Sequence, residues 1–205
     1  MQGNPHFASP LIPGPGIAQR GDPSTTKIIQ LELKILADAG LVGLPNAGKS
    51  TLLKSLTNAL PLIAPYPFTT LDPYIGVISH TDYWEMTVAD IPGLIQGAHA
   101  NKGLGHKFLR HIERTKMLVY VLDLSRTPYQ DFLVLQDELE RYLPGICQRP
   151  SVIAGNKADL AASEQNLKEL GKMTSIPIVP VSAMMEKNIG MLSAVMRSII
   201  EKIRL

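Results

Sequence analysis

The sequence predicts an α/β fold: a doubly wound, mostly parallel six-stranded sheet with helices on both faces. Two observations carry this prediction. Apolar runs of strand length alternate along the chain with segments of helix length, and such alternation requires the crossover connections that join parallel strands. The first strand also runs into a glycine-rich loop that leads directly into a helix. Folds of this kind bind ligands outside the carboxyl ends of their strands.

The individual elements follow in order after the first 26 residues. Strands are expected where short apolar runs end at turns, namely over 35–44, 74–80, 83–90, 116–123, 151–155 and 176–181. Helices are expected over 49–60, over 106–115 and through Leu133, Leu135 and Leu139. The last helix begins near Ile189 and carries apolar residues at helical spacing as far as Ile203.

Residues 1–26 differ from the rest in composition. Prolines and glycines crowd this stretch, including Pro13, Gly14, Pro15 and Gly16, which excludes a helix and disfavours a central strand. The whole chain has 205 residues, of which 45% are hydrophobic and 19% charged, a composition typical of globular proteins. We therefore divide the chain into a Pro/Gly-rich segment, 1–26, and one globular domain, 27–205.

Charge and apolar runs exclude some classes of function. A formal net charge of +2 gives the chain as a whole no strong attraction to polyanions. The longest apolar runs, such as 117–122, fall far short of the roughly 18 residues that span a membrane. A single cysteine, Cys147, excludes an intramolecular disulfide and suits a reducing compartment. We expect a monomer without a membrane span.

The segment GLPNAGKS, from Gly43 to Ser50, is a complete phosphate-binding loop. Its glycines permit the tight backbone geometry that points successive N–H groups at phosphate oxygens. The following helix adds its positive N-terminal end. Lys49 is expected to neutralise the β and γ phosphates, and the Ser50 hydroxyl to bind Mg²⁺. The other loop positions predicted to contact nucleotide are Asn46, Ala47, Gly48 and Thr51. The motif predicts a P-loop NTPase.

The segment DIPG follows the next long strand, about 40 residues beyond the loop. The carboxylate of Asp90 lies at the end of that strand, where it can hold Mg²⁺ through a water. The backbone N–H of Gly93 can reach the γ-phosphate. The pattern is common by chance, so its weight comes from its position after a strand.

The segment NKAD, from Asn156 to Asp159, is expected to select the base, with Lys157 as a further nucleotide contact. The Asp159 carboxylate can accept two hydrogen bonds from the N1–H and N2 amine of guanine, a donor pair that adenine lacks. In isolation the segment is equally consistent with a capped helix start. Ser182 and Ala183 follow the last strand, where the Ala183 N–H can contact the guanine oxygen. Together the ordered motifs predict a GTP-binding domain.

The segment YPFTT lies where a loop that senses the γ-phosphate belongs. One of its threonines is expected to bind Mg²⁺ only with GTP present, which would couple the order of the loop to the nucleotide state. The residues predicted to contact nucleotide here are Phe68, Thr69 and Thr70. The alternative is a proline-containing turn that leads into a strand.

These motifs, in this order, resemble the Obg family of GTPases. The resemblance runs from about residue 27 to the end of the chain. It includes LELKILADAGLVGLPNAGKST from Leu31, YPFTTL from Tyr66, DIPGLIQGAH from Asp90 and GLGHKFLRHIERT from Gly103. It implies that Thr70 is the threonine that binds Mg²⁺. It also implies a role in assembly of the large ribosomal subunit, with that subunit or its rRNA as the partner.

The resemblance also gives residues 1–26 a meaning, because GNPHFASP from Gly3 is similar to the end of the family's glycine-rich domain. We interpret the segment as a remnant of that domain, which is otherwise missing. The stretch Ala100-Asn101-Lys102 resembles the organellar branch. This implies the mitochondrial matrix, although no transit peptide is visible, and the cytoplasm is the alternative.

The expected catalytic residues are Lys49, Thr70, Gly93 and Asn46. Ras-like enzymes place a water-orienting glutamine directly after the DxxG glycine, where this chain has Leu94. We therefore expect Mg²⁺-dependent GTP hydrolysis at or below roughly 10⁻⁴ to 10⁻³ s⁻¹. In related GTPases an asparagine at the position of Asn46 helps to bind K⁺ beside the phosphates. A residue that merely suits the turn is an equally good interpretation.

Basic residues gather around the next predicted helix and include Lys102, Lys107, Arg110, Arg114 and Lys116. They form either a contact for RNA phosphates or a solvated face. Two further alternatives stay open for the chain as a whole. One is a nucleotide-gated regulatory module, such as a stress or GTP/GDP sensor, in which hydrolysis is incidental. The other is an inert truncated G domain.

Overall fold

The computed structural model describes residues 8–14, 24, 26–29, 37–57, 62–63, 74–90, 112 and 114–204. The chain divides into two compact units, Met1–Leu33 and Lys34–Leu205. In the first unit, Ser9 and Ile12 form an isolated antiparallel bridge closed by two backbone hydrogen bonds of 3.0 and 3.1 Å. The second unit contains the sheet and the sequence segments predicted to bind nucleotide.

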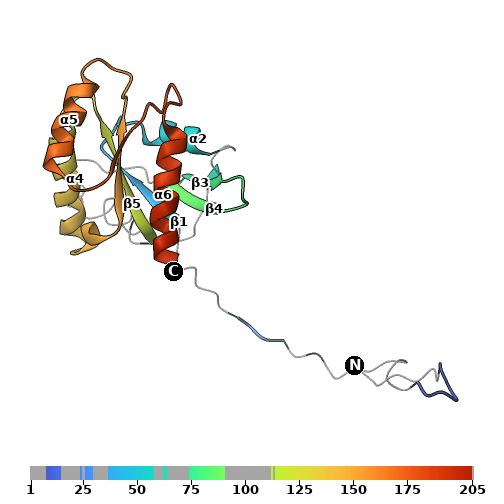
Figure 1. Ribbon diagram of the computed structural model, residues 1–205. Coiled ribbons are helices and arrows are strands. Elements are labelled where there is room, and N and C mark those ends of the chain that lie inside the picture. Colours follow the sequence, from blue (N-terminus) through green and yellow to red (C-terminus); the bar gives the residue numbers. More distant parts are fainter. Residues whose placement is uncertain are drawn as a thin grey trace. The chain divides into compact units, whose positions relative to one another are not determined.

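The sheet has seven strands in the described ranges, in the order β2-β3-β4-β1-β5-β6-β7 (Figure 1). Strand β3 pairs antiparallel with both β2 and β4, and all other neighbours are parallel. The strands are β1 (Ala37–Val42), β2 (Leu62–Ile63), β3 (Tyr74–Ser79), β4 (Glu85–Asp90), β5 (Thr115–Asp123), β6 (Ser151–Asn156) and β7 (Ile178–Pro180). The predicted α/β class and its six strands are confirmed, and β2 is an additional two-residue strand at one edge.

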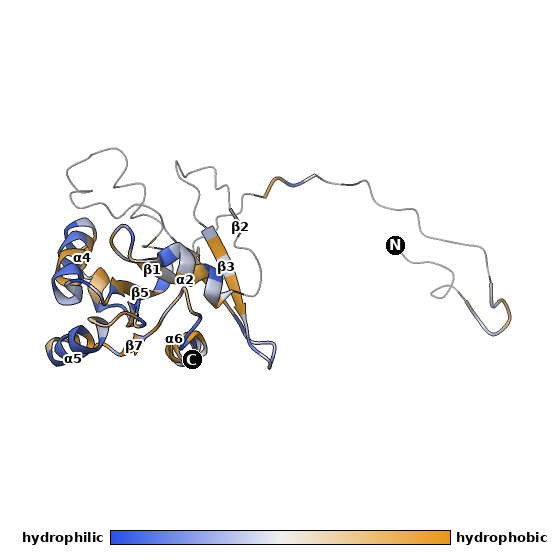
Figure 2. Ribbon diagram, turned by 90° about the horizontal axis from the view of Figure 1, so that it is seen from above, coloured by the Kyte–Doolittle hydropathy of each residue, from blue (hydrophilic) through white to orange (hydrophobic). Residues whose placement is uncertain are grey.

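Helices cover both faces of this sheet. The cores of the two faces show that α2 and α6 pack on one face and α4 and α5 on the other. In Figure 2 both strands and helices carry hydrophobic colour toward the interior, and blue gathers on the outer helix surfaces. The helices are α2 (Lys49–Leu56), α4 (Pro128–Tyr142), α5 (Ser163–Met173), α6 (Ile189–Arg204) and the short 3-10 helix η1 (Ile146–Gln148). Within the described ranges no helix combines the length and apolarity that crossing a membrane requires.

Strand β5 shows that the sheet is buried on both faces. Its side chains alternate between the two faces, and all but one of its nine residues are buried. Met117, Val119 and Val121 join the core under α2 and α6, whereas Leu118, Tyr120 and Leu122 join the core under α4 and α5. A central strand with helices on both faces has no polar side, which is why its sequence is a continuous apolar run.

Two helices differ from what the sequence predicted. The helix expected over 106–115 falls largely outside the described residues, and Thr115 at its end already belongs to β5. Helix α5 was not predicted. Only Ser163 and Leu170 of its residues are buried, and Leu167 packs against the core while partly exposed. Most of the helix is therefore polar and exposed, unlike the apolar segments from which the other helices were predicted.

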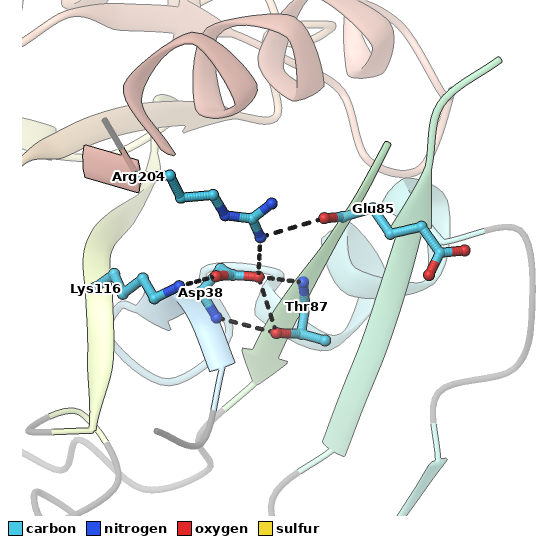
Figure 3. A network of polar contacts seen from close by, with 5 residues as sticks. All are labelled: Asp38, Glu85, Thr87, Lys116 and Arg204. Atoms are coloured by element: carbon cyan, nitrogen blue, oxygen red, sulfur yellow. Dashed lines mark hydrogen bonds and ion pairs between the residues drawn. The ribbon is translucent and has the colours of Figure 1, made fainter. Parts of the chain in front are cut away.

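A buried carboxylate joins four elements at the start of β1, at the opposite end of that strand from the phosphate loop (Figure 3). Asp38 accepts hydrogen bonds from the Lys116 ammonium on β5 at 2.8 Å, from the Thr87 N–H on β4 at 3.1 Å and from the Arg204 guanidinium on α6 at 3.1 Å. Arg204 also lies over the Trp84 ring, 5.0 Å from its centroid. The predicted basic patch is therefore wrong for Lys116, because its ammonium neutralises Asp38.

Candidate functional site

The phosphate-binding loop connects the end of β1 to the start of α2. Two of its residues have left-handed backbone conformations, Asn46 with φ 63° and Gly48 with φ 94°. A side chain at Gly48 would collide with the Asn156 amide, and one at Gly43 with the Val121 carbonyl. These two glycines are therefore required by close approach to neighbouring strands. Asparagine tolerates the left-handed region better than most residues, which fits Asn46.

Lys49 lies at the first turn of α2, and its ammonium points back along the loop. It donates hydrogen bonds to the carbonyls of Gly43 at 2.9 Å and Leu44 at 3.2 Å. Burial lowers the pKa of Lys49, and the negative charge of Asp90 partly opposes that shift. The loop thus holds a partly buried cation in position, and an anion bound beside it would stabilise its charged form.

Ser50 and Asp90 are 40 positions apart in the sequence and meet at the end of β4. The Ser50 hydroxyl donates to Asp90 Oδ2 at 2.6 Å. The other carboxylate oxygen, Oδ1, is buried and has no hydrogen-bond partner among the described residues. Burial raises the pKa of Asp90, against the Ser50 hydrogen bond and the positive charge of Lys49. A hydroxyl and a carboxylate with an unused oxygen form the kind of hard-oxygen donor set that suits Mg²⁺.

Asn156, at the end of β6, ties together two loops that are far apart in the sequence. Its amide nitrogen donates to the Ala47 carbonyl of the phosphate loop at 2.8 Å. Its amide oxygen accepts from the Ala183 N–H at 3.0 Å. The side chain is buried, at 3% exposed, and both of its ends are used. Asn156 therefore fixes the spacing between the phosphate loop and the loop that follows β7.

Asp159 is exposed and lies just beyond β6. The Ser182 hydroxyl is the main cause that lowers its pKa, followed by its own backbone N–H, and the nearby charges of Lys187 and Lys157 add to the effect. A low pKa keeps the carboxylate ionised and able to accept hydrogen bonds. Lys157 has a left-handed backbone, with φ 62°, and its ammonium pairs with Asp123 at the end of β5, 2.5 Å away.

Most of these residues line one cavity of about 500 Å³, although Asp90 and Asp123 are not among its lining residues. The phosphate loop and the start of α2 form one part of its wall, and the loops after β6 and β7 form the other. The lining residues are Asn46, Gly48, Lys49, Ser50, Thr51, Asn156, Lys157, Asp159, Leu160, Ser182, Ala183 and Met184. A volume of this size is in the range of small-molecule sites. The cavity thus joins three motifs that the sequence shows only as separate strings.

Sequence reasoning missed two apolar lining residues, Leu160 and Met184, and the carboxylate of Asp123. Met184 is 86% exposed although it lines the cavity. It directly follows the predicted contact Ala183, and only its apolar side chain gave no sign of a binding role. Asp123 ends a buried strand, as Asp90 does, so the same positional rule would have found it. The predicted residues Phe68, Thr69, Thr70 and Gly93 lie outside the described residues.

The comparison with protein families agrees with this geometry. Residues 38–157 match the family described as "50S ribosome-binding GTPase", a stretch that runs from β1 through Lys157. The chain belongs to this GTPase family. The resemblance to Obg proteins is confirmed as well. The chain is 48% identical to GTPase Obg of Acetivibrio thermocellus over 194 residues and 52% identical to that of Roseiflexus castenholzii over 180 residues.

These alignments cover most of this GTPase-family chain, 91% and 86%, but only 46% and 40% of the two relatives. The chain thus spans less than half the length of the curated relatives that it matches. Solved structures support the fold alone. The cytosolic domain of the T. maritima FeoB iron transporter in its GMPPNP form aligns with a TM-score of 0.62 at 21% identity, covering 80% of this chain and 63% of that one. The isolated G domain of the same transporter aligns with a TM-score of 0.60, covering 78% of this chain and 96% of that one.

Proposed function

We propose that this chain binds GTP and GDP in the cavity beside the phosphate loop and hydrolyses GTP slowly, as a switch in assembly of the large ribosomal subunit. One observation carries the nucleotide part of the proposal. A single cavity brings the phosphate loop together with Asp159 and Ala183, so a phosphate-binding end and a base-reading end lie within one small-molecule volume. The family match and the Obg relatives support the choice of GTP and of the ribosome.

Each end of the cavity has a distinct task in this proposal. Lys49 and the N-terminus of α2 bind the β and γ phosphates. Ser50 and Asp90 hold Mg²⁺, which would neutralise charge on the phosphate oxygens. At the other end Asp159 accepts hydrogen bonds from guanine, and the Ala183 N–H, oriented by Asn156, donates to the guanine oxygen. Thr70 and Gly93 are proposed to sense the γ-phosphate.

K⁺ is proposed as an additional charge-compensating ion beside the phosphates. Asn46 supports this assignment because it lines the same cavity as Lys49, and an asparagine side chain carries a carbonyl oxygen that can coordinate a cation. A cation there would take the place of an arginine finger, which neutralises developing charge in other GTPases. Slow unassisted turnover follows in this proposal from Leu94, an apolar side chain where a water-orienting group would be needed.

Two measurements test the proposal. Asp159→Asn replaces an acceptor by an amide, so nucleotide preference is expected to change from GDP to XDP, measured by competition against a fluorescent GDP analogue. Unchanged preference would remove Asp159 from base reading. Co-sedimentation with large ribosomal subunits, in GDP and in a non-hydrolysable GTP analogue, tests the partner. Binding only with the analogue supports the assembly switch. Intact nucleotide binding without ribosome binding favours a sensor module or an inert domain.

The mitochondrial matrix is the proposed compartment. It rests on the similarity of Ala100-Asn101-Lys102 to the organellar branch of the family. Fractionation of cells that express the epitope-tagged natural protein tests this proposal, and a purely cytoplasmic signal would contradict it.

A further inference from the structure

Two carboxylates stand near one ammonium at the base-reading end of the cavity. Lys157 Nζ lies 2.5 Å from Asp123 Oδ2. Lys157 and Asp159 line the same cavity, and the positive charge of Lys157 contributes to the lowered pKa of Asp159. Asp159 is the carboxylate proposed to read guanine, and it can do so only while its oxygens are free to accept hydrogen bonds. The question is therefore which carboxylate binds the ammonium.

Asp123 is better placed to bind it. Its side chain is 8% exposed, whereas Asp159 is exposed to solvent. Its second oxygen, Oδ1, accepts from the Ser125 N–H at 2.9 Å and from the Ser125 hydroxyl at 2.6 Å. These two bonds fix the carboxylate plane, and the strand end fixes its backbone. An ion pair with a fixed, desolvated partner is stronger than one with a partner that water can solvate.

We propose that Asp123 is a specificity-determining positioning residue: it holds the Lys157 ammonium away from Asp159, so that this ammonium does not compete with guanine for the carboxylate. This inference rests on the proposed contact of Asp159 with guanine. Asp123 acts through Lys157 and does not itself line the cavity. Lys187, the other cation that acts on Asp159, is left unchanged by every variant below.

Asp123→Asn is the first variant. Asparagine keeps an oxygen for the two Ser125 bonds but no longer carries a charge that attracts Lys157. The freed ammonium then pairs with Asp159, and guanine must displace it. An exposed ion pair shifts an equilibrium by up to about fivefold, so GDP affinity is expected to fall by roughly two- to fivefold. Asp137→Asn is the matched control, because it breaks an exposed ion pair to Arg141 on α4.

Two double variants test whether Asp123 acts through Lys157 and on Asp159. Lys157→Met keeps the length of the side chain without its charge, so adding Asp123→Asn to it is expected to cost no GDP affinity. In the Asp159→Asn background, read with XDP, adding Asp123→Asn is also expected to cost nothing, because an amide does not attract the ammonium. Affinities come from competition against a fluorescent nucleotide, and the melting temperature of each nucleotide-free variant shows whether it is folded.

The outcomes separate the possible roles. A GDP loss in Asp123→Asn that disappears in both backgrounds supports the proposal. No loss at all, or an equal loss with and without Lys157, overturns it, because Asp123 would then not act through the ammonium. A loss that persists with XDP also overturns it, since Lys157 would then cover the base instead of competing for Asp159. If Asp159→Asn alone fails to favour XDP, the proposed guanine contact fails independently of the GDP cycle.

Discussion

Replacing Asp38 by asparagine is expected to destabilise the sheet unit while leaving nucleotide affinity unchanged. Asp38 is 7% exposed and binds two cations, Lys116 at 2.8 Å and Arg204 at 3.1 Å (Figure 3). Asparagine has nearly the same shape and retains an oxygen for the Thr87 N–H. It removes the charge that balances both cations, so the substitution isolates the electrostatic contribution of the network.

The expected loss of stability follows from how deeply the side chains in each ion pair are buried. Breaking a buried pair by removing one partner costs about 3–5 kcal/mol of unfolding free energy. The Lys116 and Arg204 side chains are 28% and 39% exposed, so both can turn toward water and recover part of their solvation. We therefore expect a loss of about 2–3 kcal/mol. At about 2–4 °C per kcal/mol for a domain of this size, the melting temperature falls by about 4–12 °C.

Urea and thermal unfolding, followed by circular dichroism, measure this loss. Asp137→Asn again serves as the control, because its ion pair has side chains 61% and 56% exposed. It is expected to change stability by less than about 0.5 kcal/mol. If the two variants lose the same stability, the argument from burial is refuted. GDP affinity should stay constant, since Asp38 lies at the start of β1 and the phosphate loop follows its end.

The same variant has an expected pH signature. Burial alone would raise the pKa of Asp38, but hydrogen bonds from Lys116, Thr87 and Arg204 hold it below its ordinary 3.8. A lowered folded-state pKa stabilises the fold above the unfolded-state value, and this stabilisation is lost as the pH falls through the lowered pKa. Below about pH 4, stability should therefore fall more steeply with acid in the original protein than in Asp38→Asn. Parallel curves would contradict the assignment.

Three substitutions in the site give further expected outcomes. Asn156→Ala removes two buried hydrogen bonds. It is expected to lower the free energy of unfolding by about 2–3 kcal/mol and to weaken GDP binding. Urea unfolding measures the first effect and nucleotide competition the second, and an unchanged GDP affinity would refute the role of Asn156 in spacing the two loops. Ser50→Ala should abolish most of the gain in GTP affinity that Mg²⁺ provides, checked by titration with and without a chelator. Asn46→Ala should equalise single-turnover GTP hydrolysis in K⁺ and Na⁺; equal rates in the unaltered protein would already refute a role for K⁺.

The sequence predicted those parts of the site that depend on local geometry. The phosphate loop needs left-handed and crowded backbone positions, and the glycines Gly43 and Gly48 occupy them. Asp90, Asn156 and Ser182 follow or end predicted strands, and the carboxyl ends of parallel strands share one edge of a sheet. Position in the chain was therefore enough to place these residues near one another.

The parts that could not be predicted depend on which strands become neighbours. Asp38 sits within an otherwise apolar strand, and its partners Thr87, Lys116 and Arg204 lie 49, 78 and 166 positions away. No local pattern marks such a pairing. Lys116 shows the consequence, because charge density in the sequence placed it on a basic surface, whereas tertiary contact gives it a buried partner. Asn156 was expected only to contact nucleotide, and its bridge between two loops requires β6 to lie between β5 and β7.

The buried carboxylates at the two ends of the strands therefore have different roles. At the starting edge, Asp38 has satisfied partners on both oxygens, so its charge contributes to the stability of the fold. At the carboxyl edge, Asp90 keeps one buried oxygen without a partner among the described residues, and burial raises its pKa against the Ser50 hydrogen bond and the charge of Lys49. A group that is costly without a ligand gains most from binding one. Substitutions at Asp90 should thus affect ligand binding more than stability, and substitutions at Asp38 the reverse.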